Sequence, residues 1–265
     1  MLCNILQSEP MENLLTVEKL NVIYGKGAEA VHAVKDVSFN IKPGEIFGLV
    51  GESGCGKSSL GKAIIRITDP SSGTMDFKGI DVASLKGTAL KTYRQEVQMV
   101  FQDPYGSLNP RMKVGSAIVD VLNVHKIGDH VAERRARVAE LFEAVGLDPN
   151  WAWRYPHEFS GGQRQRICIA RALSLNPDLL VADEPVSALD VSVAAEILDL
   201  LLELREKMNL AFLFVSHDLA VVRNVCDRVA VMYNGEIVEM GDVEDVIDHP
   251  QHEYTQKLLS AVPTF

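Results

Sequence analysis

Cysteine is scarce in this sequence, and its four cysteines stand far apart. They are Cys3, Cys55, Cys168 and Cys226, and no two of them form a CxxC pair. Disulfide-rich small domains and structural zinc sites both need cysteines at short, regular spacings. The sequence therefore predicts a reduced chain of the cytosol, with neither a disulfide framework nor a zinc site.

Long apolar runs and an excess of basic charge are also missing. One of the longest apolar runs, Leu210–Val215, is far shorter than the ~18 residues that a membrane-spanning helix needs. Lysine and arginine total 26 against 36 for aspartate and glutamate, so the formal net charge is −10. A general nucleic-acid binder would instead present basic residues to phosphates. The first ten residues show no basic segment and no small-residue cleavage site, so we expect no secretory signal.

What is present is a globular composition in which strand patterns alternate with helix patterns. The 265 residues are 47% hydrophobic and 23% charged, enough to bury a sizeable core. Continuous apolar runs predict buried strands at 46–50, 97–101, 179–182 and 210–216. Apolar residues at helical spacing recur at 192–208, and after the first strand they share one face: Leu60, Ala63, Ile64 and Ile67. This alternation predicts an α/β fold on a mainly parallel sheet.

Three other segments depart from the alternation. Residues 14–47 carry short β-type runs, and Asn234-Gly235 marks a two-residue hairpin turn. The pattern after Asp103 is mostly helical, with one apolar stripe that ends at Gly146: Val138, Leu141, Phe142 and Val145. We therefore predict a core at about 14–102 and 161–248, a helical insert at about 103–160 and a C-terminal tail at 249–265.

Residues 51–58 read GESGCGKS and match the pattern GxxxxGK[ST] between a predicted strand and a predicted helix. Glycines let consecutive backbone N–H groups point inward, and the helix N-terminus adds partial positive charge. Lys57 supplies a cation for the β- and γ-phosphates, and the Ser58 hydroxyl can bind Mg²⁺. Cys55 is either a small filler or a reactive thiol with a pKa lowered by the helix N-terminus. We predict a P-loop that binds a nucleotide through Gly51, Glu52, Ser53, Gly54, Cys55, Gly56, Lys57, Ser58 and Ser59.

A second candidate group follows the apolar run at 179–182. Asp183 and Glu184 stand at its carboxyl end, where α/β sheets bind ligands. Asp183 can hold Mg²⁺ through water, and Glu184 can act as a general base toward an attacking water. An Asp-Glu pair alone is more often a surface turn, but its position after a buried strand in a chain with a P-loop favours the catalytic interpretation.

A third candidate group is the Ser-Gly-Gly-Gln segment at residues 160–163. Ser160 is a good helix N-cap, and Gly161 and Gly162 expose backbone N–H groups ahead of Gln163. The corner is therefore a candidate for a second anion site. Taken alone, it is an ordinary helix start.

The combination of these motifs resembles the nucleotide-binding subunit of ABC transporters. The resemblance covers roughly residues 14–260 and includes, after the P-loop, Ser160–Gln163, Asp183–Pro185, Ser187–Asp190 and His217. Phe159 replaces the leucine that usually opens the family signature, a departure that leaves the Ser-Gly-Gly corner intact. The resemblance implies a P-loop NTPase fold with a mainly parallel core sheet, an antiparallel β part and a helical insert.

The resemblance also implies roles that the residues by themselves do not. Two protomers would face head to tail, and Ser160–Gln163 of one would close over ATP and Mg²⁺ at the P-loop of the other. Tyr24 would stack on adenine, and Gln102 would contact Mg²⁺ and the attacking water. His217 would contact the γ-phosphate, and Asp190 would communicate across the dimer. By themselves, these single residues are ordinary packing or polar side chains.

Three stretches are similar to the ATPases of the oligopeptide, dipeptide and nickel importer group: 101–112, 183–192 and 249–259. This similarity implies an ATP-hydrolysing subunit that drives uptake of peptides or similar small solutes. The implied partners are a second ABC ATPase, identical or related, integral-membrane permease subunits and, indirectly, an extracytoplasmic solute-binding protein, with no nucleic acid. Such a chain would be peripheral at the cytoplasmic face of the inner membrane.

Two other functions stay open at this point. A soluble ABC ATPase that remodels nucleic acid or the ribosome would typically carry two ABC units or a long coiled coil, and the sequence shows one P-loop and no sustained heptads. A different P-loop enzyme, a kinase or a GTPase, would leave Ser160–Gln163 and His217 unexplained, and no NKxD guanine motif is present.

Overall fold

Two β-sheets organise the chain, of which the computed structural model describes residues 12–260. The larger sheet has the strand order β10-β9-β3-β8-β7-β6. Its strands pair in parallel except at one edge, where β10 runs antiparallel to β9. In chain order they are β3 (Ile46–Val50), β6 (Val97–Val100), β7 (Leu179–Asp183), β8 (Ala211–Ser216), β9 (Arg228–Tyr233) and β10 (Glu236–Asp242). The predicted α/β fold with a mainly parallel core sheet is confirmed.

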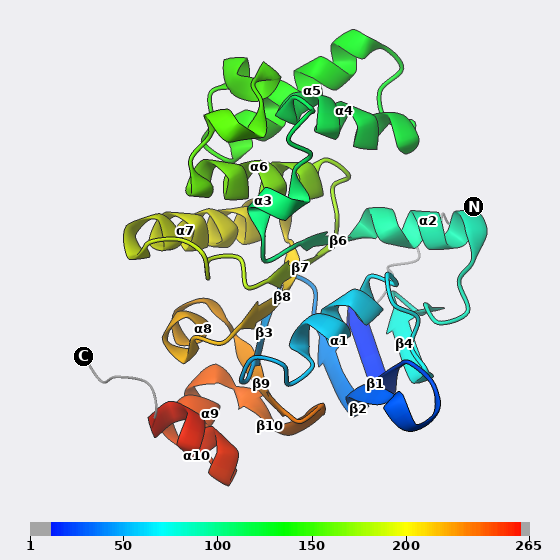
Figure 1. Ribbon diagram of the computed structural model, residues 1–265, viewed down its shortest axis with the longest axis vertical. Coiled ribbons are helices and arrows are strands. Elements are labelled where there is room, and N and C mark those ends of the chain that lie inside the picture. Colours follow the sequence, from blue (N-terminus) through cyan, green and yellow to red (C-terminus); the bar gives the residue numbers. More distant parts are fainter. Residues whose placement is uncertain (1–11, 261–265) are drawn as a thin grey trace, which may run out of the picture.

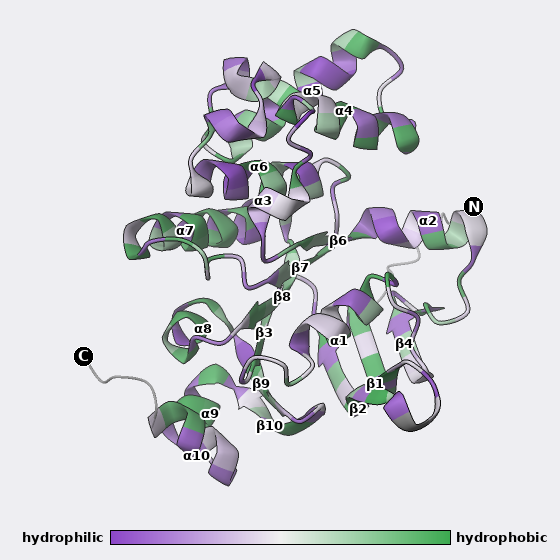
Figure 2. Ribbon diagram, viewed as in Figure 1, coloured by the Kyte–Doolittle hydropathy of each residue, from purple (hydrophilic) through white to green (hydrophobic). Residues whose placement is uncertain are grey.

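The central strands are apolar because both faces of the sheet are covered. Every residue of β3, β7 and β8 is buried, as expected of parallel strands with layers on both sides. Figure 2 shows these strands largely in the hydrophobic colour, whereas α5 and α6 mix both colours. The continuous apolar runs in the sequence are therefore the direct signature of this sheet.

The smaller sheet is antiparallel and has the order β2-β1-β4-β5. It consists of β1 (Leu15–Tyr24), β2 (Val31–Ile41), β4 (Ser72–Phe77) and β5 (Ile80–Asp81), with a short 3-10 turn, η1 (Gly27–Glu29), between the first two. One hydrophobic cluster joins it to one face of the larger sheet and to α1 (Lys57–Ile64). Figure 1 shows α1 beside β1 and β2.

The predicted face of α1 is wrong at its last member. The sequence pattern extends it to Ile67, but the helix ends at Ile64 and Ile67 is 57% exposed. Arg66 takes a φ of +57°, a left-handed conformation that a right-handed helix cannot continue. The chain then reaches β4, and α2 (Gly87–Glu96) leads into β6.

The predicted helical segment at 103–160 is helical in the structure. It contains α3 (Pro104–Ser107), α4 (Val114–Val124), α5 (Val131–Ala144), η2 (Pro149–Trp153) and η3 (Pro156–Glu158). The predicted stripe is buried, and Gly146 follows α5 with a φ of +70°. However, α6 (Gly161–Leu173) contacts α3, α4 and α5 as well as α7 (Val191–Met208). One packed cluster therefore crosses residue 160, and the division into core and insert stays a prediction.

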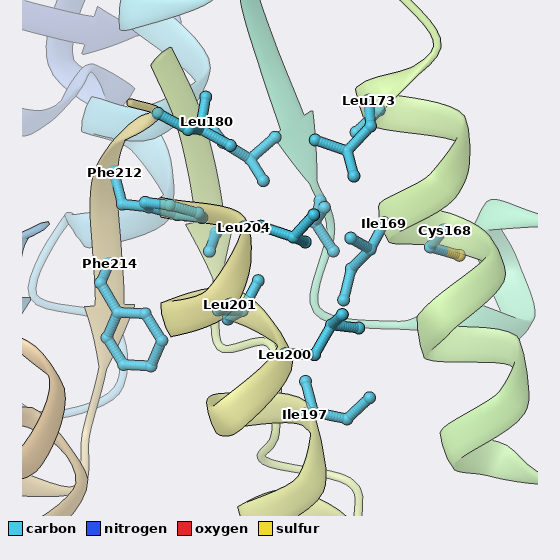
Figure 3. Packing of buried hydrophobic residues seen from close by; sticks show 14 of the residues in the cluster. Cys168, Ile169, Leu173, Leu180, Ile197, Leu200, Leu201, Leu204, Phe212 and Phe214 are labelled. Carbon is cyan, nitrogen blue, oxygen red and sulfur yellow. The ribbon is translucent and has the colours of Figure 1, made fainter. Parts of the chain in front are cut away.

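The second large cluster lies on the opposite face of the core sheet. In Figure 3, α7 lies between the strands and α6, so that its side chains reach both. Leu201 and Leu204 belong to this cluster together with Phe212 and Phe214 of β8 and Ile169 of α6. The apolar face of α7 therefore packs between β8 and α6.

Three short helices complete the described chain: α8 (Leu219–Val225), α9 (Val243–Asp248) and α10 (Glu253–Ser260). In Figure 1, α9 and α10 lie next to the β9–β10 hairpin. The last of them lies within the predicted tail, whose residues 261–265 are outside the described part, as is Cys3. Within residues 12–260, no helix is both long and apolar enough to cross a membrane.

Candidate nucleotide-binding site

The P-loop connects the carboxyl end of β3 to the first turn of α1, as the sequence predicts. Gly56 is the N-cap of α1 with a φ of +114°, which only glycine adopts readily. A side chain at Gly56 would collide with the Ala33 carbonyl oxygen, and one at Gly51 with that of Met232. The two glycines thus let the loop pass closely between the two sheets.

Lys57 lies within the curve of this loop and is only 4% exposed. Its Nζ donates hydrogen bonds to the carbonyl oxygens of Gly51, at 2.6 Å, and Glu52, at 2.9 Å. A buried charge without hydrogen-bond partners costs much free energy, and these two contacts reduce that cost for the Lys57 ammonium. Lys57 thus places a buried cation inside the loop that the sequence predicts to bind phosphates.

Ser58 and Asp183 come together although they are far apart in the sequence. The Ser58 hydroxyl donates a hydrogen bond of 3.0 Å to Asp183 Oδ1. Burial raises the pKa of Asp183, while the Ser58 hydrogen bond opposes this shift. A cation beside this pair would relieve the cost of the buried carboxylate.

Glu184 is the meeting point of the other predicted catalytic residues. Its Oε2 accepts a hydrogen bond of 2.8 Å from Gln102 Nε2 and lies 3.3 Å from His217 Nδ1. The three come from the ends of β6, β7 and β8, which are adjacent in the sheet. Glu184 has a φ of +47°, a left-handed conformation that is uncommon outside glycine and concentrates at functional sites.

One pocket of about 970 Å³ gathers most of the predicted residues. Its lining includes Tyr24, the nine P-loop residues from Gly51 to Ser59, Gln102, Glu184 and His217. Tyr24 is 38% exposed, and its hydroxyl lies 3.5 Å from Thr68 Oγ1. The structure thus brings the aromatic side chain, the cation and the candidate base to one cavity.

The pocket also has walls that sequence reasoning missed. They are formed by Val31, His32, Ala33 and Lys35 of β2, by Asn234 and Gly235 of the hairpin turn, and by Leu258 of α10. The Asn-Gly pair is recognisable as a turn, and both residues have positive φ, but no local pattern shows that it faces the P-loop. The residues of β2 and Leu258 belong to no recognisable sequence motif, so the sequence does not indicate that they line the pocket.

The Ser160–Gln163 corner and Asp190 do not line this pocket. Ser160 caps α6: its Oγ accepts from Gln163 N at 3.3 Å, and Gln163 Oε1 accepts from Ser160 N at 3.0 Å. Asp190 caps α7 by accepting from Val193 N at 3.0 Å and from the Ser192 hydroxyl at 2.8 Å. Within one chain, both are helix caps, which the sequence predicts for Ser160 but not for Asp190.

The interpretation of Cys55 as an activated thiol is not supported. Cys55 is 8% exposed, and burial raises the pKa of its thiol, outweighing the lowering influence of Lys57, whose Nζ is 3.8 Å from the sulfur. Of the two interpretations of Cys55, the structure therefore favours the small residue that fills space in the loop. No group of three or more His, Cys, Asp or Glu side chains with metal-ligating spacing occurs in the part of the chain that the structure describes.

The fold and this pocket define a P-loop nucleotide-binding protein. Residues 34–187 match the ABC transporter family, and residues 238–265 match the C-terminal region of oligopeptide/dipeptide transporters. The chain belongs to the ABC transporter family, which confirms the resemblance drawn from its motifs.

Relatives are found among ATP-binding proteins of importers and transporters. The chain is 55% identical to the glutathione import ATP-binding protein GsiA of Pectobacterium atrosepticum over 88% of its length, but it spans only 37% of that protein. It is 49% identical to the oligopeptide transport ATP-binding protein OppF of Streptococcus mutans, covering 97% of this chain and 83% of that one. It is 54% identical to the related AppF of Bacillus subtilis, covering 88% of this chain and 71% of AppF.

Solved structures agree with the fold. The structure of cbiO1 from Clostridium perfringens, part of an ABC transporter complex, superposes with a TM-score of 0.79 at 30% identity, covering 90% of this chain and 92% of that chain. A dimeric ATP-binding cassette in a post-hydrolysis state, bound to ADP and Pi, gives a TM-score of 0.77 at 30% identity, covering 86% and 98%.

Proposed function

We propose that this chain is the ATP-hydrolysing subunit of an ABC importer for peptides or similar small solutes. Family membership implies ATP binding. One observation supports the hydrolytic activity in particular. Three groups meet around one pocket: Lys57, the Ser58–Asp183 pair and the Gln102–Glu184–His217 group. A fixed cation, a metal-binding pair and a base are the parts that phosphoryl transfer to water needs.

Magnesium fits the oxygen donors of the site. Ser58 and Asp183 would hold it, with Gln102 contributing its amide oxygen, because Mg²⁺ prefers hard oxygen ligands and keeps several waters. The buried Asp183 carboxylate, already in contact with the Ser58 hydroxyl, supports this assignment. When bound, the ion would neutralise charge on the β- and γ-phosphates.

The proposed mechanism centres on Glu184 Oε2, which contacts both Gln102 and His217. This carboxylate would accept a proton from water, while Gln102 and His217 fix its orientation through contacts of 2.8 Å and 3.3 Å. His217 also lines the pocket and would contact the γ-phosphate. Lys57 would exchange its contacts with the loop carbonyls for phosphate oxygens, and Tyr24 would stack on adenine.

A second ATPase protomer, identical or related, would complete the site. The Ser160–Gln163 corner lies outside the pocket of its own chain, although Ser160 opens a capped helix suited to an anion. We place it over the nucleotide of the partner, with Asp190 at the junction between the two protomers. The dimeric state named for one structural neighbour supports this arrangement.

Import is the direction that the relatives favour. Their names specify glutathione import and oligopeptide transport. We propose that the chain lies at the cytoplasmic face of the inner membrane and drives permease subunits through the helices of 103–160, with an extracytoplasmic binding protein delivering the solute.

The Glu184→Gln variant tests the catalytic assignment. It removes the basic oxygen while keeping the size of the side chain, so it should bind ATP with unchanged affinity and lose turnover by about 100-fold or more. Phosphate release and equilibrium binding of a fluorescent ATP analogue measure the two effects. Glu143→Gln, an exposed substitution on α5, is the matched control. Normal hydrolysis by Glu184→Gln would refute the assignment.

A further inference from the structure

The last described helix lies against the P-loop. The Tyr254 hydroxyl on α10 accepts a hydrogen bond of 3.1 Å from the backbone N–H of Glu52. Leu258, one helical turn further along, lines the nucleotide pocket itself. The C-terminal segment therefore contributes both a hydrogen bond and a wall to a site whose motifs lie about 200 residues earlier in the chain.

The hydrogen bond of Tyr254 acts on the same peptide group that holds Lys57. The carbonyl oxygen of Gly51 accepts from Lys57 Nζ at 2.6 Å, and the N–H of that peptide, which belongs to Glu52, donates to Tyr254. The peptide plane is thus fixed on both sides. Rotation of this plane would break one or both contacts and would turn the start of the loop away from its phosphate-binding form.

α10 is itself firmly attached to the β9–β10 hairpin. The Tyr254 ring packs on Tyr233 with a centroid distance of 4.2 Å, and Tyr254 is only 6% exposed. Glu239 of β10 accepts hydrogen bonds from the backbone N–H groups of Gln251, at 2.7 Å, and His252, at 3.1 Å. The turn of the same hairpin holds the P-loop at a second point, because Gly235 N donates to Cys55 O at 2.9 Å.

We propose that Tyr254 is a positioning residue for nucleotide binding, through which the C-terminal helix holds the P-loop in its binding conformation. This inference rests on the proposed ATP-binding function of the same pocket. A loop that is ordered before the ligand arrives loses less conformational freedom on binding, which increases affinity. The hydroxyl contacts the loop backbone, and Tyr254 does not line the pocket, so we expect its effect to be on affinity rather than on the hydrolysis step.

The test compares Tyr254→Phe with Tyr233→Phe in the full chain. Both variants lose one phenolic oxygen from the same pair of packed rings, but only the first loses the contact with Glu52. Equilibrium binding of a fluorescent ATP analogue should weaken about two- to tenfold in Tyr254→Phe, the range of one hydrogen bond, and stay unchanged in Tyr233→Phe. Thermal melting should agree within about 2 °C between the two variants, since the ring packing is kept.

Two further readouts separate positioning from general destabilisation. Hydrogen exchange at the Glu52 amide should speed up in Tyr254→Phe. Exchange in helix α5, which does not line the pocket, should stay unchanged. Glu239→Ala, which removes the hydrogen bonds to Gln251 and His252 but keeps Tyr254, should weaken binding in the same direction. Unchanged affinity in Tyr254→Phe, or an equal loss in Tyr233→Phe, overturns the proposal. Absence of ATP binding by the unmodified chain would instead refute the proposed function.

Discussion

At the scale of the residue, the site depends on side chains whose partners were invisible in the sequence. The motif identifies Lys57 as a phosphate ligand, but only the fold shows that two loop carbonyls hold its ammonium. Glu184 is identifiable from its place after an apolar run. Its contacts with Gln102 and His217 exist because three neighbouring strands end at one edge of the sheet.

Replacing Lys57 by alanine should weaken ATP binding about 10- to 150-fold. A hydrogen bond to a charged group contributes about 1.5–3 kcal/mol, and each 1.4 kcal/mol is about tenfold in affinity. Titration of a fluorescent ATP analogue measures the loss. Lys42→Ala, in an exposed turn before β3, is the control and should bind normally. Equal affinity of the two variants would show that the ammonium does not reach the nucleotide.

Alkylation of Cys55 should be slow at neutral pH. The thiolate is the reactive form, and burial raises the pKa of the Cys55 thiol above its ordinary value, so the reactive fraction at neutral pH is small. The rate of iodoacetamide labelling at Cys55, followed by mass spectrometry from neutral to alkaline pH, should have its midpoint at a higher pH than that of a free cysteine thiol measured in parallel. A midpoint below that of the free thiol would restore the activated-thiol interpretation. Cys55→Ser is the control for labelling at other cysteines.

At the scale of the element, the N-terminus of α6 illustrates how a functional corner is also a packing junction. A side chain added at Gly162 would collide with Cγ1 of Val193 on α7, whereas one at Gly161 would make an ordinary contact of 3.5 Å with Leu189. Valine cannot move its branched side chain easily. The second glycine is therefore required by helix packing, independently of any anion.

The two glycines should respond differently to alanine. Gly162→Ala should lower the free energy of unfolding by about 1–3 kcal/mol because of overpacking against Val193. Gly161→Ala should leave it unchanged or raise it by about 0.4–1 kcal/mol, since alanine restricts the unfolded chain. Urea unfolding followed by circular dichroism measures both. Similar stability of the two variants would contradict the close approach of α6 and α7.

At the scale of the whole molecule, the described chain has one P-loop pocket, and its Ser-Gly-Gly corner does not line that pocket. With saturating ATP, the Glu184→Gln variant should therefore have twice the monomer mass in light scattering, alone or mixed with a related ATPase partner. Adding Ser160→Arg should return it to the monomer, because the new side chain blocks the corner. Thr88→Arg, at an exposed position of α2, is the control and should leave the dimer intact. A persistent monomer with ATP and candidate partners would contradict the two-protomer site.

The sequence by itself determined the strands, the P-loop and the acidic pair, because these depend on local chemistry: unbroken apolar runs, glycine at backbone positions that exclude side chains, and carboxylates directly after a strand. It could not determine the end of α1, which depends on the backbone conformation of Arg66. It also could not place β2, the hairpin turn and α10 around the pocket. Those contacts join residues far apart in the chain, and only the packing of the two sheets and the C-terminal helices brings them together.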